Sequence, residues 1–520
     1  MRAALALLLT AACCLAQEPR PLAGTSPLTE SGDFSARMVQ GIGTWLERET
    51  ARVAADRDRR WHEAASGPEW PAFAKTQREK LRQAIGAIDP RTPGKIEEIS
   101  EAGAPPAVAS AAGYTLRRVS WPVFAGVNGE GVLLQPEVVP RRFVIVVPDA
   151  DELPEVSPLA HRLAAEGCLV LVPALLDRRD NFSGSAALQR FTNQPHREWI
   201  QRQAFELGRT VIGYEVQKIL AAVDAFTTPG SRLHAAAPVA LAGEGEGGLL
   251  ALHAAALDDR IGAVLVGGYF GPREGLFAEP LYRNVFGLLK DFGDAELAAL
   301  IAPRPLLVAH SSIREISGPP EVRAGRAGAA PGRITQPPLA AVIEEIRRAN
   351  ELRSASPVRL ARGANDESQA ITSDRIVRAF LSMLQLRPRD EGPATKRELV
   401  SFDLRQRDGR QQRGIAELEE FQRRLMMDAE RSRTAAVLSK TKPGAEWDTA
   451  QSALRTRLYD ESIGRITAAR STANPHSRLI REESKWLGYE VTLDVLPDVF
   501  AWGWLLVPCD LKEGERRPVV

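Results

Sequence analysis

Six short apolar runs separated by helical patterns constrain the fold of this chain more than any other feature. They cover residues 142–147, 168–175, 238–243, 261–270, 304–310 and 357–362. Near-continuous apolar strands that alternate with helices are typical of a parallel sheet covered on both faces. An antiparallel hairpin over 113–121 and 129–136 precedes them. We therefore predict an α/β domain with a mostly parallel eight-stranded sheet and helices on both faces.

Helical periodicity surrounds and separates these strands. Helices are predicted over 34–64, 69–87, 156–166, 197–226, 247–257, 373–386, 413–438 and 447–458. This pattern predicts an N-terminal helical region at 17–105, the α/β domain at 106–388 and a helical linker at 389–465.

The last residues of the chain repeat the beginning of the α/β domain. Gly488-Tyr489 matches Gly113-Tyr114, and "VFAWGWLLVP" matches "VFAGVNGEGVLLQP". The period of 375 residues (489 − 114 = 375) is far longer than a solenoid repeat and indicates a duplicated domain. We expect residues 466–520 to begin a second α/β domain that stops at Val520, where its first buried parallel strand begins.

Charge and N-terminal composition bear on location and partners. The 67 Lys and Arg residues nearly cancel the 66 Asp and Glu residues, so neither a nucleic acid nor an anionic membrane surface is implied as a partner. The opening "MRAALALLLTAACCLAQEP" predicts a signal peptide over 1–16 and export to the periplasm or the exterior. A lipoprotein with Cys13 or Cys14 lipidated is the alternative.

The rest of the sequence offers no membrane, metal or cofactor motif. No other segment reaches 18 apolar residues, so no membrane span is expected. No cluster of His, Cys and Asp has metal-ligand spacing, and we expect neither a metal nor a cofactor. Cys168 and Cys509 lie in apolar runs and are predicted to be two unrelated buried thiols.

The stretch "PVALAGEGEGGLLALHAAAL", residues 238–257, is a strand that ends in glycines and passes into a helix. Gly243, Gly245 and Gly248 spell the dinucleotide loop G-x-G-x-x-G. That loop should follow the first strand of its unit and precede an acidic residue by about 20 positions. Here the strand is the third parallel one, and Asp258 and Asp259 are too close. The dinucleotide interpretation is therefore disfavoured.

The other interpretation is the nucleophile elbow G-x-S-x-G of hydrolases, framed by Gly243 and Gly247 with Gly245 in place of the serine. With this elbow, "NQPHREWIQRQAFELGRTVIGYEVQKILAAVDAF" and "LIAPRPLLVAH", residues 106–388 resemble an α/β-hydrolase domain of the acetyl xylan esterase and dienelactone hydrolase type. The resemblance implies an oxyanion hole that combines the backbone N–H of Glu246 with one from the loop of Asp149 and Ala150.

The chain departs from that family at the catalytic residues. Gly245 has no attacking group, Asn365 stands nearest to the expected histidine, and Glu315 is the remnant of the acid member. Because asparagine cannot deprotonate an alcohol, we predict a lost triad. Glu244 and Glu246 flank the elbow position without occupying it.

Other chemistry-bearing side chains have weaker claims to a role in catalysis. His310 ends a strand at the active-site edge and is the outlying candidate for a base, whereas His253 is expected in the core. His196 and Arg197 are expected to make structural hydrogen bonds, and the hydroxyls of "NFSGS" (181–185) have no identifiable base.

The resemblance implies hydrolysis of a carboxylic ester, for example acetyl groups on a polysaccharide. We expect that chemistry from a second domain beyond Val520. The alternative is a non-catalytic pseudoenzyme that binds a carbohydrate, an ester or a protein partner.

Overall fold

The computed structural model describes residues 20–99, 107–111, 113–228, 238–353, 356–389, 404–436, 443–512 and 514–518. The predicted signal peptide at 1–16 lies outside the described residues. The chain divides into two compact units, a smaller one of residues 1–52 and 441–520 and a larger one of residues 53–440. The larger unit contains the predicted α/β domain.

A ten-stranded mixed sheet organises the larger unit, in the order β13-β12-β11-β10-β6-β7-β5-β4-β2, with β3 paired to β4. The strands are β2 (Glu97–Glu98), β3 (Ala107–Ala111), β4 (Tyr114–Phe124), β5 (Val127–Pro136), β6 (Phe143–Val147), β7 (Leu169–Pro173), β10 (Val239–Glu244), β11 (Ile261–Gly267), β12 (Leu306–Ala309) and β13 (Arg359–Ala361). β5 is antiparallel to β4 and β7. The six strands β7, β6, β10, β11, β12 and β13, named in their order across the sheet, run parallel to one another. The predicted α/β class is confirmed. The strand number is ten rather than eight because the short β2 and β3 pair with β4.

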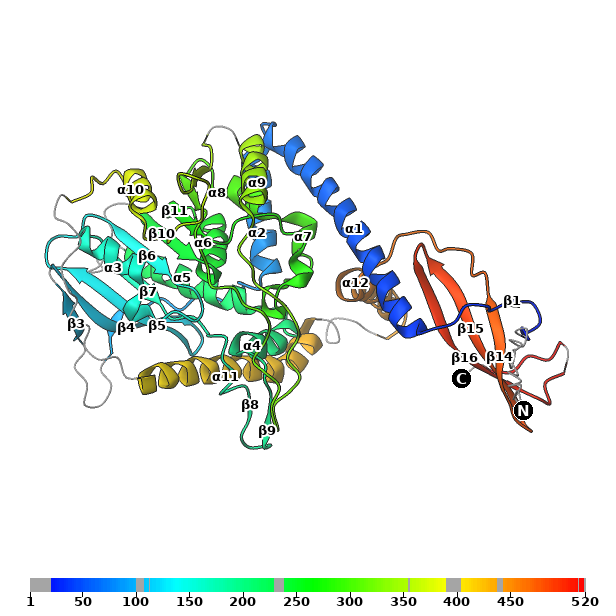
Figure 1. Cartoon of the computed structure of the whole chain (residues 1–520). Helices are drawn as coiled ribbons and strands as arrows, with labels where there is room; N and C mark the ends of the chain where they lie inside the picture. The colour runs from blue at the N-terminus through cyan, green and yellow to red at the C-terminus, as the bar shows by residue number, and fades with distance from the viewer. Residues whose placement is uncertain are drawn as a thin grey trace, which may run out of the picture. The chain divides into compact units, whose positions relative to one another are not determined.

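Helices cover both faces of this sheet (Figure 1). One face packs on α3 (Pro158–Ala165) and α10 (Asp374–Met383). The other packs on α2 (Trp70–Ala84), α5 (Val211–Thr227), α6 (Glu246–Leu257), α8 (Asp294–Ile301) and α9 (Leu339–Leu352). Side chains of successive strand residues point to opposite faces of the sheet. Val144 and Val146 therefore pack on the side of α3, and Ile145 and Val147 pack on the side of α5 and α6.

The helix expected over 197–226 is two helices, α4 (His196–Phe205) and α5. The chain turns at Gly208, whose φ of +69° is left-handed. Thr210 then caps α5, because its Oγ1 accepts a hydrogen bond from the Gly213 N–H at 2.9 Å. Glycine adopts positive φ at little cost and threonine is a favourable N-cap, so these two residues account for the break.

A helix expected within a linker instead completes the core of the larger unit. α11 (Leu404–Ala436) buries Ile415, Leu418 and Phe421. The ring of Phe421 lies 4.8 Å from that of Phe124, and Gln411 Nε2 donates to the Leu175 carbonyl at 2.8 Å. This part of the predicted linker at 389–465 is therefore an integral layer of the α/β unit.

The remaining short elements of the larger unit lie in its connecting segments. They are η1 (Pro154–Val156), β8 (Gly184–Ser185), β9 (Arg190–Phe191), η2 (Leu276–Ala278), η3 (Leu281–Arg283) and α7 (Leu288–Asp291). β8 and β9 pair with each other in a separate two-stranded sheet.

The smaller unit contains a four-stranded sheet in the order β1-β14-β15-β16. Its elements are β1 (Ser26–Pro27), α12 (Ala445–Arg457), η5 (Leu458–Ile463), β14 (His476–Glu482), β15 (Trp486–Leu496) and β16 (Val499–Pro508), together with the first part of α1 (Phe34–Ala65). Phe34 at the start of α1 stacks on Trp502 of β16, with ring centroids 5.9 Å apart. This contact fixes the helix start against the sheet.

The hairpin β15–β16 has the same construction as the hairpin β4–β5. In each, an 11-residue strand is followed by a 10-residue strand. The pairing is irregular between Pro122 and Phe124 in one hairpin and between Asp494 and Leu496 in the other. Equivalent residues are 372 positions apart, as the last residues show (508 − 136 = 372).

The neighbouring strand extends this equivalence and corrects the predicted period of 375. β3 shifts register after its pair Ala107 with Arg117, and β14 shifts after its pair Leu479 with Tyr489. Tyr489 therefore occupies the position of Arg117, not that of Tyr114. Aligned by strand register, the two hairpins are 372 positions apart, and the two Gly-Tyr pairs do not coincide in that alignment.

The two cysteines differ in their surroundings. Cys168 is buried, as predicted, and burial raises the pKa of its thiol to about 12. Cys509 is exposed, contrary to the prediction, because it follows the solvent-exposed end of β16. No helix within the described ranges is both long and apolar enough to span a bilayer.

Candidate functional site

The chain changes the side on which it adds strands in the middle of the sheet of the larger unit, between the parallel strands β6 and β10. The chain goes from β6 to β7 on one side and then returns to β10 on the other side of β6. Ligands of open α/β sheets bind at such a switch point, beyond the carboxyl ends of the strands. The loop that begins at Pro148 and the turn at Gly245 follow these two strands and therefore form the candidate site.

The turn after β10 has the strained geometry of an elbow. Gly245 has φ +56° and ψ −117°, and its N–H donates to the Gly267 carbonyl at 3.0 Å. A Cβ on Gly243 would lie 2.1 Å from the Gly247 carbonyl oxygen, and one on Gly247 would lie 2.0 Å from that of Val147. Both flanking positions therefore require glycine, as an elbow does.

A carboxylate of the protein itself occupies the space in front of Gly245. A Cβ on Gly245 would lie 2.6 Å from Oδ1 of Asp149. The same Oδ1 accepts a hydrogen bond from the backbone N–H of Glu246 at 2.9 Å. That N–H is the donor expected to belong to an oxyanion hole, so the Asp149 side chain is bound where an oxyanion would be. The resemblance to hydrolases implies only a backbone N–H from the loop of Asp149 and Ala150 at this place, whereas the structure puts the Asp149 side chain there.

Arg178 holds Asp149 in position through a bidentate ion pair. Its Nη1 lies 2.6 Å from Oδ2 of Asp149, and its Nη2 lies 2.9 Å from Oδ1. Burial by itself raises the pKa of Asp149, but the hydrogen bonds and charge of Arg178 outweigh it and keep that pKa below its ordinary value. Asp149 is therefore an ionised, fully engaged carboxylate at neutral pH.

Glu246 lies fully buried beneath the turn and is surrounded by arginines. Its carboxylate oxygens lie 2.9 Å from Arg283 Nε, 3.0 Å from Arg197 Nη2 and 3.4 Å from Arg178 Nη2. Burial raises the pKa of Glu246, yet the three guanidinium groups together lower it to about 2. A carboxylate so paired serves the structure and is not available as a nucleophile or base.

The space in front of Gly245 that the Asp149 carboxylate fills is called the crevice below. A cavity of about 330 Å³ lies beside it, at the same edge of the sheet. Glu152, Glu244, Ser157, Ser312 and Thr372 line it together with apolar residues. Burial, and then the charge of Glu152, raise the pKa of Glu244 to about 8. Burial and the charge of Asp149 raise the pKa of Glu152 to about 7. The two carboxyls are therefore substantially protonated at neutral pH and can donate hydrogen bonds.

The other predicted catalytic residues lie in the segments that follow β12 and β13. Glu315 is exposed and accepts a hydrogen bond from the Gln336 N–H at 3.4 Å, and Asn365 is exposed in the loop after β13. His310 is buried, and its Nε2 accepts from Gln336 Nε2 at 3.0 Å. Glu315 and His310 therefore both form a hydrogen bond with Gln336. No hydrogen bond or ion pair among the described residues joins Glu315, Asn365 or His310 to Gly245.

Two other histidines, His253 and His196, have structural surroundings. His253 is buried in α6, its Nδ1 lies 2.8 Å from the Leu249 carbonyl, and burial lowers its pKa to about 4. His196 lies 2.7 Å from Asp177 through Nδ1 and accepts from the Phe182 N–H through Nε2. Ser183 of the "NFSGS" loop is fully buried. Within the described ranges, no three His, Cys, Asp or Glu residues gather in a metal-binding arrangement.

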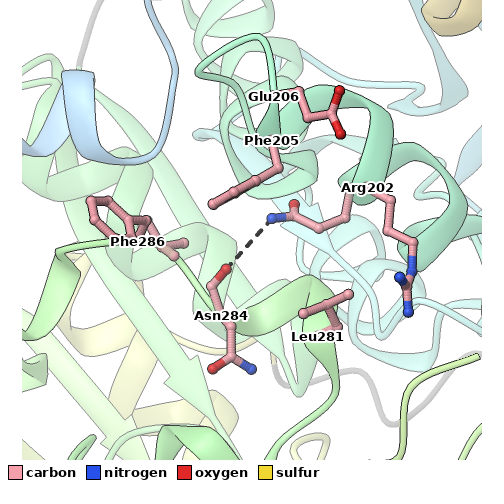
Figure 2. A pocket seen from close by; sticks show the side chains of 8 residues that line it. Arg202, Phe205, Glu206, Leu281, Asn284 and Phe286 are labelled. Carbon is pink, nitrogen blue, oxygen red and sulfur yellow. Dashed lines mark hydrogen bonds between the residues drawn. The ribbon is translucent and has the colours of Figure 1, made fainter. Parts of the chain in front are cut away.

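A second cavity of about 480 Å³ lies between the end of α4 and the segment after η3 (Figure 2). Phe205 and Phe286 line it and meet at 77° with ring centroids 6.4 Å apart. Gln201 Nε2 donates to the Asn284 carbonyl at 3.5 Å, and both residues line the cavity. None of the predicted triad residues lines this cavity, so it is distinct from the elbow site.

Sequence reasoning missed Arg178, which holds Asp149 in front of Gly245, and Arg283, which pairs with Glu246 beneath the turn. Arg178 lies in "LLDRRDNF", and its only signal was a cluster of charged residues shortly after a buried strand. Nothing in the sequence indicates that Arg283, 37 positions beyond Glu246, pairs with it.

Comparisons with known proteins find distant structural likenesses. No family model and no curated protein matches the sequence. Among solved structures, the methylesterase BT1017 is 16% identical with a TM-score of 0.38, covering 59% of this chain and 62% of its own. A putative acetyl xylan esterase from Bacteroides fragilis is 14% identical with a TM-score of 0.39, covering 62% of this chain and 84% of its own. Acetyl xylan esterase 1 from Thermoanaerobacterium sp. is 12% identical with a TM-score of 0.39, covering 63% and 98%. The first of these likenesses spans less than two thirds of the methylesterase.

Proposed function

We propose that the larger unit is an α/β-hydrolase domain related to carboxylic ester hydrolases of the acetyl xylan esterase type, and that it no longer catalyses hydrolysis. The strand order supports the fold, because the switch point coincides with the elbow after β10. The two flanking glycines support the elbow, because neither Gly243 nor Gly247 has room for a Cβ.

The occupation of the crevice by Asp149 carries the proposal of inactivity. Acyl transfer needs a nucleophile, a base and free donors for the oxyanion. Gly245 supplies no nucleophile, and the Glu246 N–H is already bound to Asp149 at 2.9 Å. Both oxygens of Asp149 are engaged by Arg178, so this carboxylate does not replace the missing serine.

The cavity beside the crevice supports a binding function for the same unit. Its volume of about 330 Å³ suits a small ligand. Because Glu244 and Glu152 have pKa values raised to about 8 and about 7, they favour a neutral ligand with hydroxyl or carbonyl oxygens over an anion. An ester or a carbohydrate fits this description.

A second candidate function places hydrolysis elsewhere in an exported protein. In it, residues 1–16 direct export, and residues 466–520 begin a second α/β-hydrolase domain that carries out the ester hydrolysis. The constant offset of 372 positions between β3-β4-β5 and β14-β15-β16 favours the duplication.

An ester hydrolysis assay tests the inactive-site proposal. Residues 17–520 are incubated with 4-nitrophenyl acetate at pH 7, and the unsubstituted chain is compared with Gly245→Ser. We expect no protein-dependent release of 4-nitrophenol from either, because no base would deprotonate the added hydroxyl. Turnover that disappears in His310→Ala or Asp149→Asn would overturn the proposal and identify an active group.

A further inference from the structure

The sheet of the smaller unit exposes apolar side chains that its counterpart in the larger unit buries. In β5, Val132, Leu133 and Leu134 are 0%, 5% and 0% exposed. Their equivalents in β16, Trp504, Leu505 and Leu506, are 60%, 37% and 54% exposed. Since the two hairpins share strand lengths and register, the difference comes from what lies beside and over the last strand.

The larger unit shows what covers such a strand. β7 pairs with β5 in antiparallel register, with Leu133 opposite Leu171 and Leu134 opposite Val170. α3 and α11 then pack over the two faces of β5. Among the described residues, β16 ends its sheet and has β15 as its only strand partner. The outer backbone groups of residues 503–506 therefore have no strand beside them.

We propose that the outer edge of β16, residues 503–506, is a docking edge for an antiparallel apolar β-strand of an α/β sheet. The incoming strand takes the register that β7 has against β5, with one apolar residue opposite Leu505 and the next opposite Leu506. This inference rests on the duplication proposed above, and it adds the position, direction and register of the strand that would pair with β16.

The side chains of β16 determine the chemistry of the occupant. Trp504 and Leu506 project to one face of the sheet and Leu505 to the other, because side chains alternate along a strand. A partner must therefore bring apolar residues to both faces, as the "LVLVP" of β7 does. Strand addition supplies main-chain hydrogen bonds for affinity and side-chain pairing for specificity. A strand with charged side chains at these positions would place unpaired charges against Trp504, Leu505 and Leu506, which is unfavourable.

β7 itself provides the probe. A fluorescent peptide of residues 166–176 carrying Cys168→Ser is titrated into the chain of residues 17–520, and binding is measured by anisotropy and by hydrogen exchange of the amides of 503–507. The control peptide carries Val170→Pro and Val172→Pro, which remove two main-chain donors. The matched chain variants are Leu505→Lys on the edge strand and Leu493→Lys on the inner strand β15, whose leucines are 37% and 39% exposed.

We expect the β7 peptide to bind and to slow exchange at 503–507, and the proline peptide to do neither. Leu505→Lys should weaken binding at least about tenfold, whereas Leu493→Lys should leave it unchanged. Absence of protection at 503–507 would overturn the inference. Protection of 503–507 without peptide, in a dimer that Leu505→Lys dissociates, would identify a second copy as the occupant and also overturn it. Both results leave the Asp149 proposal untouched, because no residue of the crevice is altered.

Discussion

Replacing Gly245 by alanine is the sharpest perturbation of the occupied crevice. The added methyl group would lie 2.6 Å from Oδ1 of Asp149, well inside van der Waals contact. Asp149 cannot simply turn away, because Arg178 and the Glu246 N–H hold both of its oxygens. The substitution therefore has to break this arrangement or deform the turn.

The expected loss has two parts. An L-residue at φ +56° and ψ −117° adds backbone strain of about 1–3 kcal/mol. Loss of the charge-assisted hydrogen bonds of Asp149 adds about 1.5–3 kcal/mol. We expect Gly245→Ala to lower the free energy of unfolding by about 2.5–6 kcal/mol, measured by urea denaturation of the larger unit.

Gly287 provides a control that separates the backbone strain of an L-residue at positive φ from the collision of an added Cβ with Asp149. Gly287 has φ +75° but no atom within 4 Å of an added Cβ. Gly287→Ala should therefore lower the free energy of unfolding by only about 1–2 kcal/mol. Asp149→Ala combined with Gly245→Ala should cost about 1–3 kcal/mol less than the sum of the single changes, because the collision is then absent. Equal losses for Gly245→Ala and Gly287→Ala would refute the assignment of Asp149 to this space.

Two further predictions concern the buried carboxyls. Glu246→Gln removes the charge shared by three arginines and should lower the free energy of unfolding by about 3–5 kcal/mol, whereas Glu206→Gln on the exposed end of α4 should change it by less than about 0.5 kcal/mol. The raised pKa of Glu244 means that the folded state binds its proton more tightly, so stability should fall as pH rises from about 4.5 to about 8. Glu244→Gln should remove about 1–3 kcal/mol of that fall, measured as the free energy of unfolding against pH; an unchanged pH profile would show that Glu244 is solvated.

Local patterns in the sequence were sufficient to predict most of the sheet, because a strand buried on both faces must be apolar throughout. The run at 142–147 became β6 and that at 238–243 became β10 with shifts of one residue. β2 could not be predicted in this way. It consists of Glu97 and Glu98, and only its pairing with β4 makes it a strand.

The candidate site was predictable where its geometry is local. Gly243 and Gly247 reveal the elbow because close backbone packing excludes every side chain there. The contact of Asp149 with Arg178 was not predictable, because the two residues are 29 positions apart and meet through loop conformations that no periodic pattern encodes. The glycine at the elbow position could therefore be read from the sequence, but the Asp149 carboxylate that lies in front of it could not.

Rescue of Asp149→Ala by formate tests most directly whether a carboxylate fills the crevice. The substitution leaves Arg178 and the Glu246 N–H facing the space vacated by the carboxylate, and formate has the size and charge of the missing group. We expect sodium formate to raise the melting temperature of Asp149→Ala above that in sodium chloride of equal ionic strength, and to leave the unsubstituted chain unchanged. Equal responses of the two proteins to formate would contradict the account.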